Sequence, residues 1–204
     1  GLIDHLKEVY PQLVQGLTPQ PYPLTTIMSV CRALLAERVP LKDFRRIAEA
    51  MVAQAGRDLD PAALVEAVRQ ELGSLIVQGI VPMKMPLPIV TFDGELEQLL
   101  VRSVRAGPGA VWPFEPDLAS RIVAAVGEAV QPLLLAARSC AIVTAPECRA
   151  AVSRLLRGQI SDLPVLSFLE IPETKAVDVL AVVGGKKDHP ALARPDDGAS
   201  AGGD

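Results

Sequence analysis

Histidine, cysteine and aromatic residues are scarce in this chain of 204 residues, and their scarcity excludes several kinds of site. Only two histidines occur, His5 and His189, so the interior offers no imidazole for a catalytic triad, a general base or a zinc site. The three cysteines form no CxxC pair, which favours small buried side chains in a reducing compartment over reactive thiols or metal ligands. We therefore expect no catalytic residue, no metal site and no cofactor.

Long apolar runs, an excess of basic charge and phosphate-binding loops are also missing. The longest apolar stretch, residues 129–143, is interrupted by Gln131, Pro132 and Arg138, so no segment approaches the ~18–20 residues that span a bilayer. A net charge of −4 argues against a general nucleic-acid binder. No GxxxxGK[ST] motif occurs, which argues against nucleotide binding. The chain begins at Gly1 without a leader sequence, which predicts a piece of a longer protein.

The first 85 residues carry the apolar spacing of helices. Hydrophobic residues make up 50% of the chain and charged residues 22%, which is typical of a globular protein with an aliphatic core. Asp60 and Pro61 mark one helix start, since aspartate is favoured as the N-cap and proline at the first helical position. We therefore predict an all-α unit over residues 1–85. Its expected helices span residues 1–16, interrupted by Pro11, and residues 24–35, 41–55 and 61–76.

Residues 86–185 alternate between strand and helix patterns. Their β-branched, nearly continuous apolar runs predict a small mixed sheet covered by helices, which makes the whole chain an α+β protein. Residues 186–204 are rich in glycine, aspartate, proline and alanine, and we expect a disordered tail there. The expected strands are 89–92, 141–144, 165–169 and 177–183, and the expected helices are one capped by Asp93, 117–137 and 146–157.

One helix of the first unit is open to a DNA-binding interpretation. Residues 41–55 could act as a recognition helix, with Lys42, Arg45 and Arg46 reaching phosphates. Acidic Glu37, Asp43 and Glu49 interleave with these bases, which favours a solvated helix face that carries ion pairs.

Two features of the second unit are also ambiguous. The basic stripe Arg149, Arg154 and Arg157 fits either an acidic partner or a solvated helix face, and the solvated face is favoured. Trp112 and Phe114 lie in a Gly/Pro-rich loop, where they serve either as an aromatic docking point or as a cover over their own core. We expect the cover.

Several short strings occur in an order that resembles the cytoplasmic region of the flagellar and type III secretion export-gate family, also called FHIPEP. Each string is weak alone, but together they run over nearly the whole chain to about residue 185. The strings are YPLTTI at 22–27, LLAERVPLKD at 34–43, VRQELGSLI at 68–76, LEQLL at 96–100, PECR at 146–149 and DLPVLSFLEIP at 162–172.

The resemblance implies a non-enzymatic protein-transport component. Members of this family are inner-membrane proteins whose cytosolic part forms a nine-fold ring of identical subunits. That ring receives export chaperone–substrate complexes and works with other export-apparatus proteins on the cytoplasmic face of the bacterial inner membrane. Residues 1–85 would correspond to the third cytosolic subdomain and residues 86–185 to the fourth. No nucleic acid is expected as a partner.

Protein–protein contact needs apolar anchors with a polar rim, and two groups of candidate contact residues follow. The alternative from another class is a DNA-binding, winged-helix-like regulator with an appended α/β domain. A contiguous positive face on residues 41–55 would favour DNA, and a face of mixed sign would favour assembly. The candidates are Arg45 and Arg46 for subunit contact, and Val165, Leu166, Ser167 and Glu170 for partner contact.

Overall fold

The computed structural model describes residues 1–160 and 163–184, and the first part of the chain is helical as predicted. Proline and aspartate set some of the helix starts, and the Asp60 side chain accepts a 2.7 Å hydrogen bond from the backbone N–H of Ala63 at the start of one helix. We call this part the helical unit. Its helices are α1 (Leu2–Val9), α2 (Pro11–Leu17), α3 (Leu24–Ala36), α4 (Phe44–Ala53), α5 (Pro61–Glu71) and α6 (Gly73–Gln78).

The helix expected over residues 61–76 is divided into α5 and α6 at Leu72. Gly73 lies so close to the backbone of Glu170 that a Cβ atom there would come within 2.1 Å of the Glu170 carbonyl oxygen. The break therefore lies where a segment about 100 residues further along the chain packs against the helix, as α6 packs on the short turn that contains Glu170. A distant contact of this kind leaves no helical-periodicity signal.

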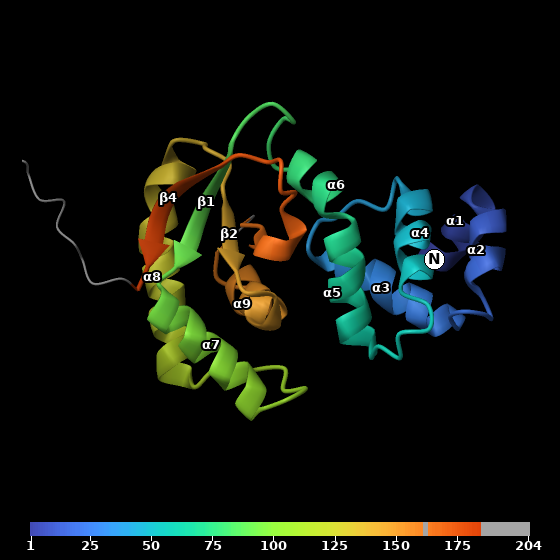
Figure 1. Ribbon diagram of the computed structural model, residues 1–204, viewed down its shortest axis with the longest axis horizontal. Helices are drawn as coiled ribbons and strands as arrows, with labels where there is room; N and C mark the ends of the chain where they lie inside the picture. Colours follow the sequence, from blue (N-terminus) through green and yellow to red (C-terminus); the bar gives the residue numbers. More distant parts are fainter. Residues whose placement is uncertain (161–162, 185–204) are drawn as a thin grey trace, which may run out of the picture.

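The second part of the chain alternates strands and helices around one sheet (Figure 1). We call this part the sheet unit. In the sheet the strands lie in the order β3-β2-β1-β4. Its elements are β1 (Leu87–Phe92), α7 (Gly94–Ala106), α8 (Pro116–Leu135), β2 (Ala141–Thr144), α9 (Pro146–Arg157), β3 (Val165–Ser167), the 3-10 helix η1 (Phe168–Glu170) and β4 (Val177–Val183).

The sheet is parallel throughout, so the predicted mixed sheet is wrong. Each neighbouring pair, β1 with β2, β1 with β4 and β2 with β3, is parallel. Strands β3 and β4 are consecutive in the chain, yet they lie at opposite edges of the sheet. The link between them must cross the sheet, and a crossing link brings β4 in parallel to β1.

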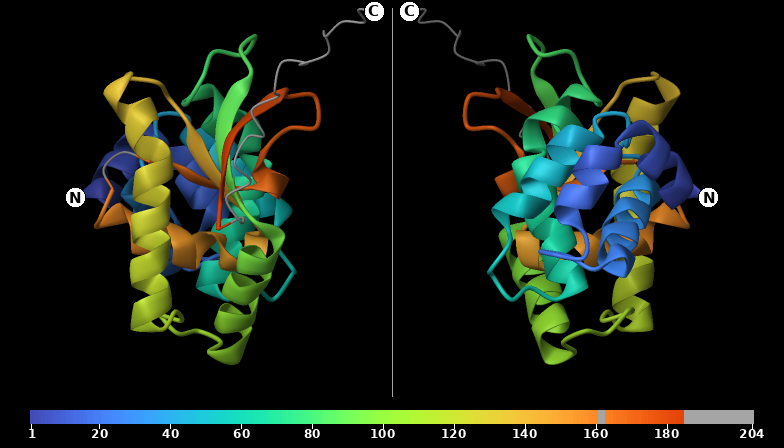
Figure 2. Two further views of the ribbon diagram at one scale, coloured as in Figure 1. Left: turned by 90° about the vertical axis from the view of Figure 1, so that its left-hand side faces the viewer. Right: turned by 90° about the vertical axis from the view of Figure 1, so that its right-hand side faces the viewer.

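The two faces of the sheet belong to two different apolar cores. Because side chains alternate along a strand, Ile89 and Leu166 point to one face while Val90 and Val165 point to the other. The first face packs with the helical unit and the second with α7, α8 and α9. Figure 1 shows this layering, with the helical unit on one side of the sheet and α7 and α8 on the other. Figure 2 shows the helical unit and the sheet unit one behind the other from either end.

Helix α8 corrects one expectation from the sequence. It is long and apolar enough to cross a membrane by length and composition, whereas no segment was expected to approach that length. Only 22% of its apolar window is buried, because α8 turns a single stripe of side chains at four-residue spacing into the second core. That stripe consists of Leu118, Ile122, Val126 and Val130.

The remaining expectations have mixed outcomes. All three cysteines are free and buried, as predicted. The two aromatic residues of the Gly/Pro-rich loop differ in burial. Phe114 is buried as predicted, but the Trp112 side chain is 65% exposed. The division of the chain at residue 85 stays a prediction, since the first core extends across it to Leu87 and Ile89. The predicted tail, residues 186–204, lies outside the described residues.

Candidate functional site

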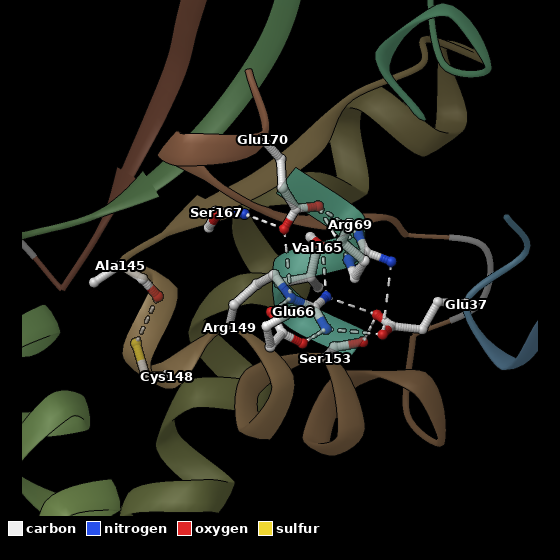
Figure 3. A network of polar contacts seen from close by, with 10 residues as sticks. All are labelled: Glu37, Glu66, Arg69, Ala145, Cys148, Arg149, Ser153, Val165, Ser167 and Glu170. Atoms are coloured by element: carbon white, nitrogen blue, oxygen red, sulfur yellow. Dashed lines mark hydrogen bonds and ion pairs between the residues drawn. The ribbon is translucent and has the colours of Figure 1, made fainter. Parts of the chain in front are cut away.

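Polar side chains gather where the helical unit meets the sheet unit, and we call them the arginine cluster (Figure 3). They come from segments far apart in the sequence: the end of α3, the middle of α5, α9 and the 3-10 helix η1. Two of them, Arg69 and Arg149, are among the largest fully buried side chains of the described residues. The members of the cluster are Glu37, Glu66, Arg69, Arg149, Ser153 and Glu170.

Arg149 uses all five of its N–H donors. Two of them bind the carboxylate of Glu66 at 2.7 Å, two bind the carboxylate of Glu37 at 2.8 Å, and one binds the carbonyl oxygen of Val165 at 3.0 Å. Paired, planar hydrogen bonds of this kind are among the strongest contacts that a guanidinium makes. With its side chain 1% exposed, Arg149 of α9 is thereby tied to both α3 and α5 of the helical unit.

Arg69 also joins the two units, but here the arginine belongs to α5 of the helical unit and its partners belong to the sheet unit. Its Nε and Nη2 atoms donate to one carboxylate oxygen of Glu170 at 3.0 and 2.7 Å, and Nη2 also reaches the Val165 carbonyl at 3.4 Å. The third nitrogen, Nη1, has no hydrogen-bond partner among the described residues. Its nearest anion is Glu37, at 3.7 Å, on the side to which Figure 3 shows it pointing.

The two arginines favour the ionised form of Glu37. Burial alone would raise the pKa of Glu37, but hydrogen bonds and charge from Arg149, together with Arg69, lower that pKa to about 2. Burial would likewise lower the pKa of Arg149, but its bonds to Glu66 and Glu37 raise it instead. Glu37 and Arg149 therefore stabilise each other's charged form, and both stay ionised at neutral pH.

These contacts make the arginine cluster a clamp between the units. Glu170 also accepts a 3.2 Å hydrogen bond from the backbone N–H of Ser167, and Ser153 donates a short hydrogen bond to Glu37. Every member thus has a partner within the chain, and breaking one such buried pair typically costs about 3–5 kcal/mol. Among the described residues, no group of three or more histidine, cysteine or acidic side chains could hold a metal ion.

An open cleft lies beside the cluster, between α3, α6, α8 and α9. Its volume is about 780 Å³, and both units contribute to its walls. The lining combines basic side chains such as Arg157 with apolar ones such as Leu134, and Arg69 of the cluster also reaches it. The cleft is therefore a concave feature at the junction of the units.

The predicted subunit-contact residues lie on the surface. Arg45 and Arg46 are exposed on α4, which faces its apolar side chains into the first core. Arg45 pairs with Glu49, one turn further along the helix, at 3.4 Å. This helix face is therefore of mixed sign, the pattern expected for assembly rather than for DNA. The contact itself stays a prediction.

The predicted partner-contact residues lie inside the chain. Val165, Leu166, Ser167 and Glu170 are all buried. Val165 and Leu166 face the two cores, and Glu170 belongs to the arginine cluster, so these side chains are not open to a partner in this structure.

The exposed members of the same segment are the next two residues, Phe168 and Leu169, each 53% exposed. They stand on η1, between the buried end of β3 and the buried Glu170.

Sequence analysis missed the role of Arg149. The favoured interpretation placed it on a solvated helix face with Arg154 and Arg157, and the structure shows that this is wrong for Arg149. Helical spacing did carry a signal, since Arg149 precedes the buried Ser153 by four residues and so shares its face. The strings that carry the family resemblance contain Glu37, Arg69, Arg149 and Glu170, and the fold brings all four together.

Comparison with known proteins identifies the family. The model of the FHIPEP family matches residues 1–176, which is most of the chain. The flagellar biosynthesis protein FlhA of Salmonella typhimurium is 33% identical over 185 residues, which cover 91% of this chain and 26% of that protein. The chain thus spans about a quarter of the length of this relative.

Solved structures share the fold. The nonameric EPEC SctV-C matches with a TM-score of 0.75 and 26% identity, over 89% of this chain and 55% of that one. The Chlamydia pneumoniae CdsV protein, solved in complex with CdsO, matches with a TM-score of 0.77 and 23% identity, over 89% of this chain and 54% of that one. The family match, the relative and the shared fold agree, and the chain belongs to the FHIPEP family of export-gate proteins.

Proposed function

We propose that this chain is the C-terminal portion of the cytosolic region of a flagellar or type III export gate. In this role it forms part of a nine-fold ring and helps to dock chaperone–substrate complexes for translocation. The observation that carries the proposal is the match, at a TM-score of 0.75, to a relative solved as a nonamer. The parent protein would be anchored in the bacterial inner membrane, with this portion on its cytoplasmic face.

The chain works by contact and carries out no reaction of its own. Its most connected polar group, the arginine cluster, is occupied with joining two parts of the same chain. The relative CdsV was solved with CdsO bound, which supports a role in binding other export-apparatus proteins. Membership of a transport family supports the same conclusion.

Two surfaces are proposed for these contacts. Arg45 and Arg46 of α4 would meet the neighbouring subunit, because they are exposed on the outer face of the helical unit. The segment around β3 would meet a partner through Phe168 and Leu169, because its other members are buried. Exposed apolar side chains beside charged ones form the kind of anchor that protein partners use.

Ring formation is tested in the complete cytosolic region of the parent protein. We expect single-particle images of that region to show nine-fold rings. The double variant Arg45→Glu, Arg46→Glu should weaken assembly at least about tenfold, because each reversed charge repels what the arginine attracted. The matched variant Arg102→Glu, Arg121→Glu reverses two exposed arginines of the sheet unit and should leave the rings intact. Monomers at all concentrations of the unmodified protein would contradict the proposal.

Partner docking is tested by capture of purified export chaperones on the same cytosolic region. The variant Phe168→Asp, Leu169→Asp should reduce capture, because it removes an exposed apolar anchor. The variant Met83→Asp, Met85→Asp changes two other exposed apolar side chains and serves as the matched control. Equal capture by both variants would move the docking surface elsewhere, and retention of duplex DNA without capture of any export component would favour a regulator instead.

A further inference from the structure

The arginine cluster joins the two units, but this role does not account for the cleft that lies beside the cluster. Its walls come from both units, with α3 and α6 on one side and α8, α9 and β3 on the other. A volume of about 780 Å³ is in the range of sites that hold drug-sized ligands or a few residues of peptide.

The charge of this cleft is opposite to that of the chain. The chain as a whole carries a net charge of −4, yet Glu37 is the only acidic side chain among the described residues that line the cleft. Glu37 and Arg69 both belong to the arginine cluster, where Glu37 is paired with Arg149 and Arg69 with Glu170. A concave surface with this imbalance concentrates anions. Outside the cluster, the basic side chains of the lining are Arg38, Lys42, Arg138 and Arg157.

One buried donor of the lining is unused. The Arg69 side chain is 2% exposed, and its Nη1 atom makes no hydrogen bond among the described residues. Buried guanidinium nitrogens are normally satisfied, and the Glu37 carboxylate, 3.7 Å from this Nη1 atom, is too far for a hydrogen bond, so the atom can still donate to an incoming anion. Arg138 and Arg157 at the rim are exposed, and neither has a partner among the described residues.

Apolar side chains complete the lining and define the kind of anion. Leu75 and Ile80 from the helical unit and Leu134 and Leu163 from the sheet unit all reach the cleft. A free inorganic anion would gain nothing from them, and a nucleic acid would be repelled by the negative charge of the rest of the chain. A peptide that alternates carboxylates with aliphatic side chains would use both parts of the lining.

We propose that this cleft binds an acidic, leucine-rich peptide segment of a partner protein, with its carboxylates on Arg138 and Arg157 and its aliphatic side chains on the apolar wall. The inference rests on the proposed function, since it names the chemistry by which one docking partner is held. Because both units form the walls, a bound segment would also bridge the junction that the arginine cluster clamps.

The experiment measures binding of a fluorescent hexapeptide of alternating glutamate and leucine to the 204-residue chain by anisotropy. We expect saturable binding that weakens as NaCl is raised, and no binding of the same peptide with glutamine in place of glutamate. The variant Arg138→Glu, Arg157→Glu should bind at least about tenfold more weakly, whereas Arg102→Glu, Arg121→Glu should stay within about twofold of the unmodified chain. Circular dichroism checks that both variants fold.

A second measurement needs no variant. In NMR spectra of the unmodified chain, the peptide should shift the amide signals of Ile80, Leu134 and Leu163, which line the cleft. No binding, equal weakening by the two charge-reversal variants, shifts confined to other residues, or displacement of the peptide by equimolar inorganic phosphate would each overturn the inference. A failed ring test with intact peptide binding would count against the proposed function alone, and the reverse result against this inference alone.

Discussion

The two faces of the sheet are covered in different ways. On one face, α7, α8 and α9 pack through apolar side chains such as Ile122 and Val152. On the other face, the helical unit packs through apolar side chains and, beside them, through the arginine cluster. Apolar packing is nearly non-directional, whereas paired hydrogen bonds between charged groups allow one geometry. The comparison teaches that buried charged contacts orient the helical unit, whereas the polar contacts of α7, from Arg105 and Glu97, are exposed or only partly buried.

The largest effect that tests this comparison is the loss of Arg149. In Arg149→Met the carboxylates of Glu37 and Glu66 stay buried without their partner, and we expect the free energy of unfolding to fall by about 3–5 kcal/mol. Urea denaturation measures the change. The matched variant Arg105→Met breaks a pair with Glu147 in which the side chains are 66% and 46% exposed. Equal losses in the two variants would contradict the distinction between clamp and surface pair.

The acid dependence of stability gives the next largest effect. Because the pKa of Glu37 is about 2 in the folded chain and near 4.5 when unfolded, its ionisation stabilises the fold above pH 4.5. This contribution, about 3 kcal/mol, should be lost as the pH falls from 4.5 to 2. Urea midpoints across that range measure it. In Glu37→Gln the slope of stability against pH should be shallower, and an unchanged slope would contradict the assignment.

The close approach at Gly73 gives a smaller effect. A methyl group in Gly73→Ala would overlap the carbonyl oxygen of Glu170 and push η1 away from α6, so we expect a loss of about 1–3 kcal/mol. Gly94→Ala is the matched control, since a Cβ there has no neighbour within 4 Å. Thermal unfolding of the two variants compares them. A Gly73→Ala chain as stable as Gly94→Ala would show that the contact with η1 is easily relaxed.

The smallest effect is expected at the surface pair itself. Arg105 donates two hydrogen bonds to Glu147, at 2.7 and 2.8 Å, and so joins α7 to α9 within the sheet unit. Exposed pairs contribute little to stability because water and salt screen them. We therefore expect Arg105→Met to change the urea midpoint little, and the small difference to vanish in 1 M NaCl. A loss as large as that in Arg149→Met would give this pair a structural role like that of Arg149.

Local sequence signals predicted much of the fold. The strands 141–144 and 177–183 and the helix 146–157 agree with the structure residue for residue. Each is bounded by a local signal, such as Pro146 at the first position of α9. The strand expected over 165–169 ends at Ser167 instead, because Glu170 turns inward to the arginine cluster and the chain forms η1.

The remaining features depend on contacts between distant segments. The parallel direction of β4 is set by its place beside β1, which no local pattern reveals. The burial of Arg149 depends on Glu66 and Glu37, which precede it by 83 and 112 residues. The exposure of Arg149 was predicted from its near neighbours in the sequence, among which few acidic residues occur. The exposure of Phe168 and Leu169 was likewise not predicted, because both residues belong to an apolar run that is typical of one buried strand.

The central claim is that the arginine cluster fixes how the two units sit together, and a distance between them tests it most directly. Spin labels on cysteines introduced at Glu8 and Arg102, both exposed, would report that distance, since the native cysteines are buried. In a variant with Glu37, Glu66 and Arg149 all replaced by methionine, the chain should remain folded, because an apolar replacement of a buried ion group is often tolerated. We predict a narrow distance distribution in the parent chain and a broad or shifted one in this variant. Identical narrow distributions would contradict the claim.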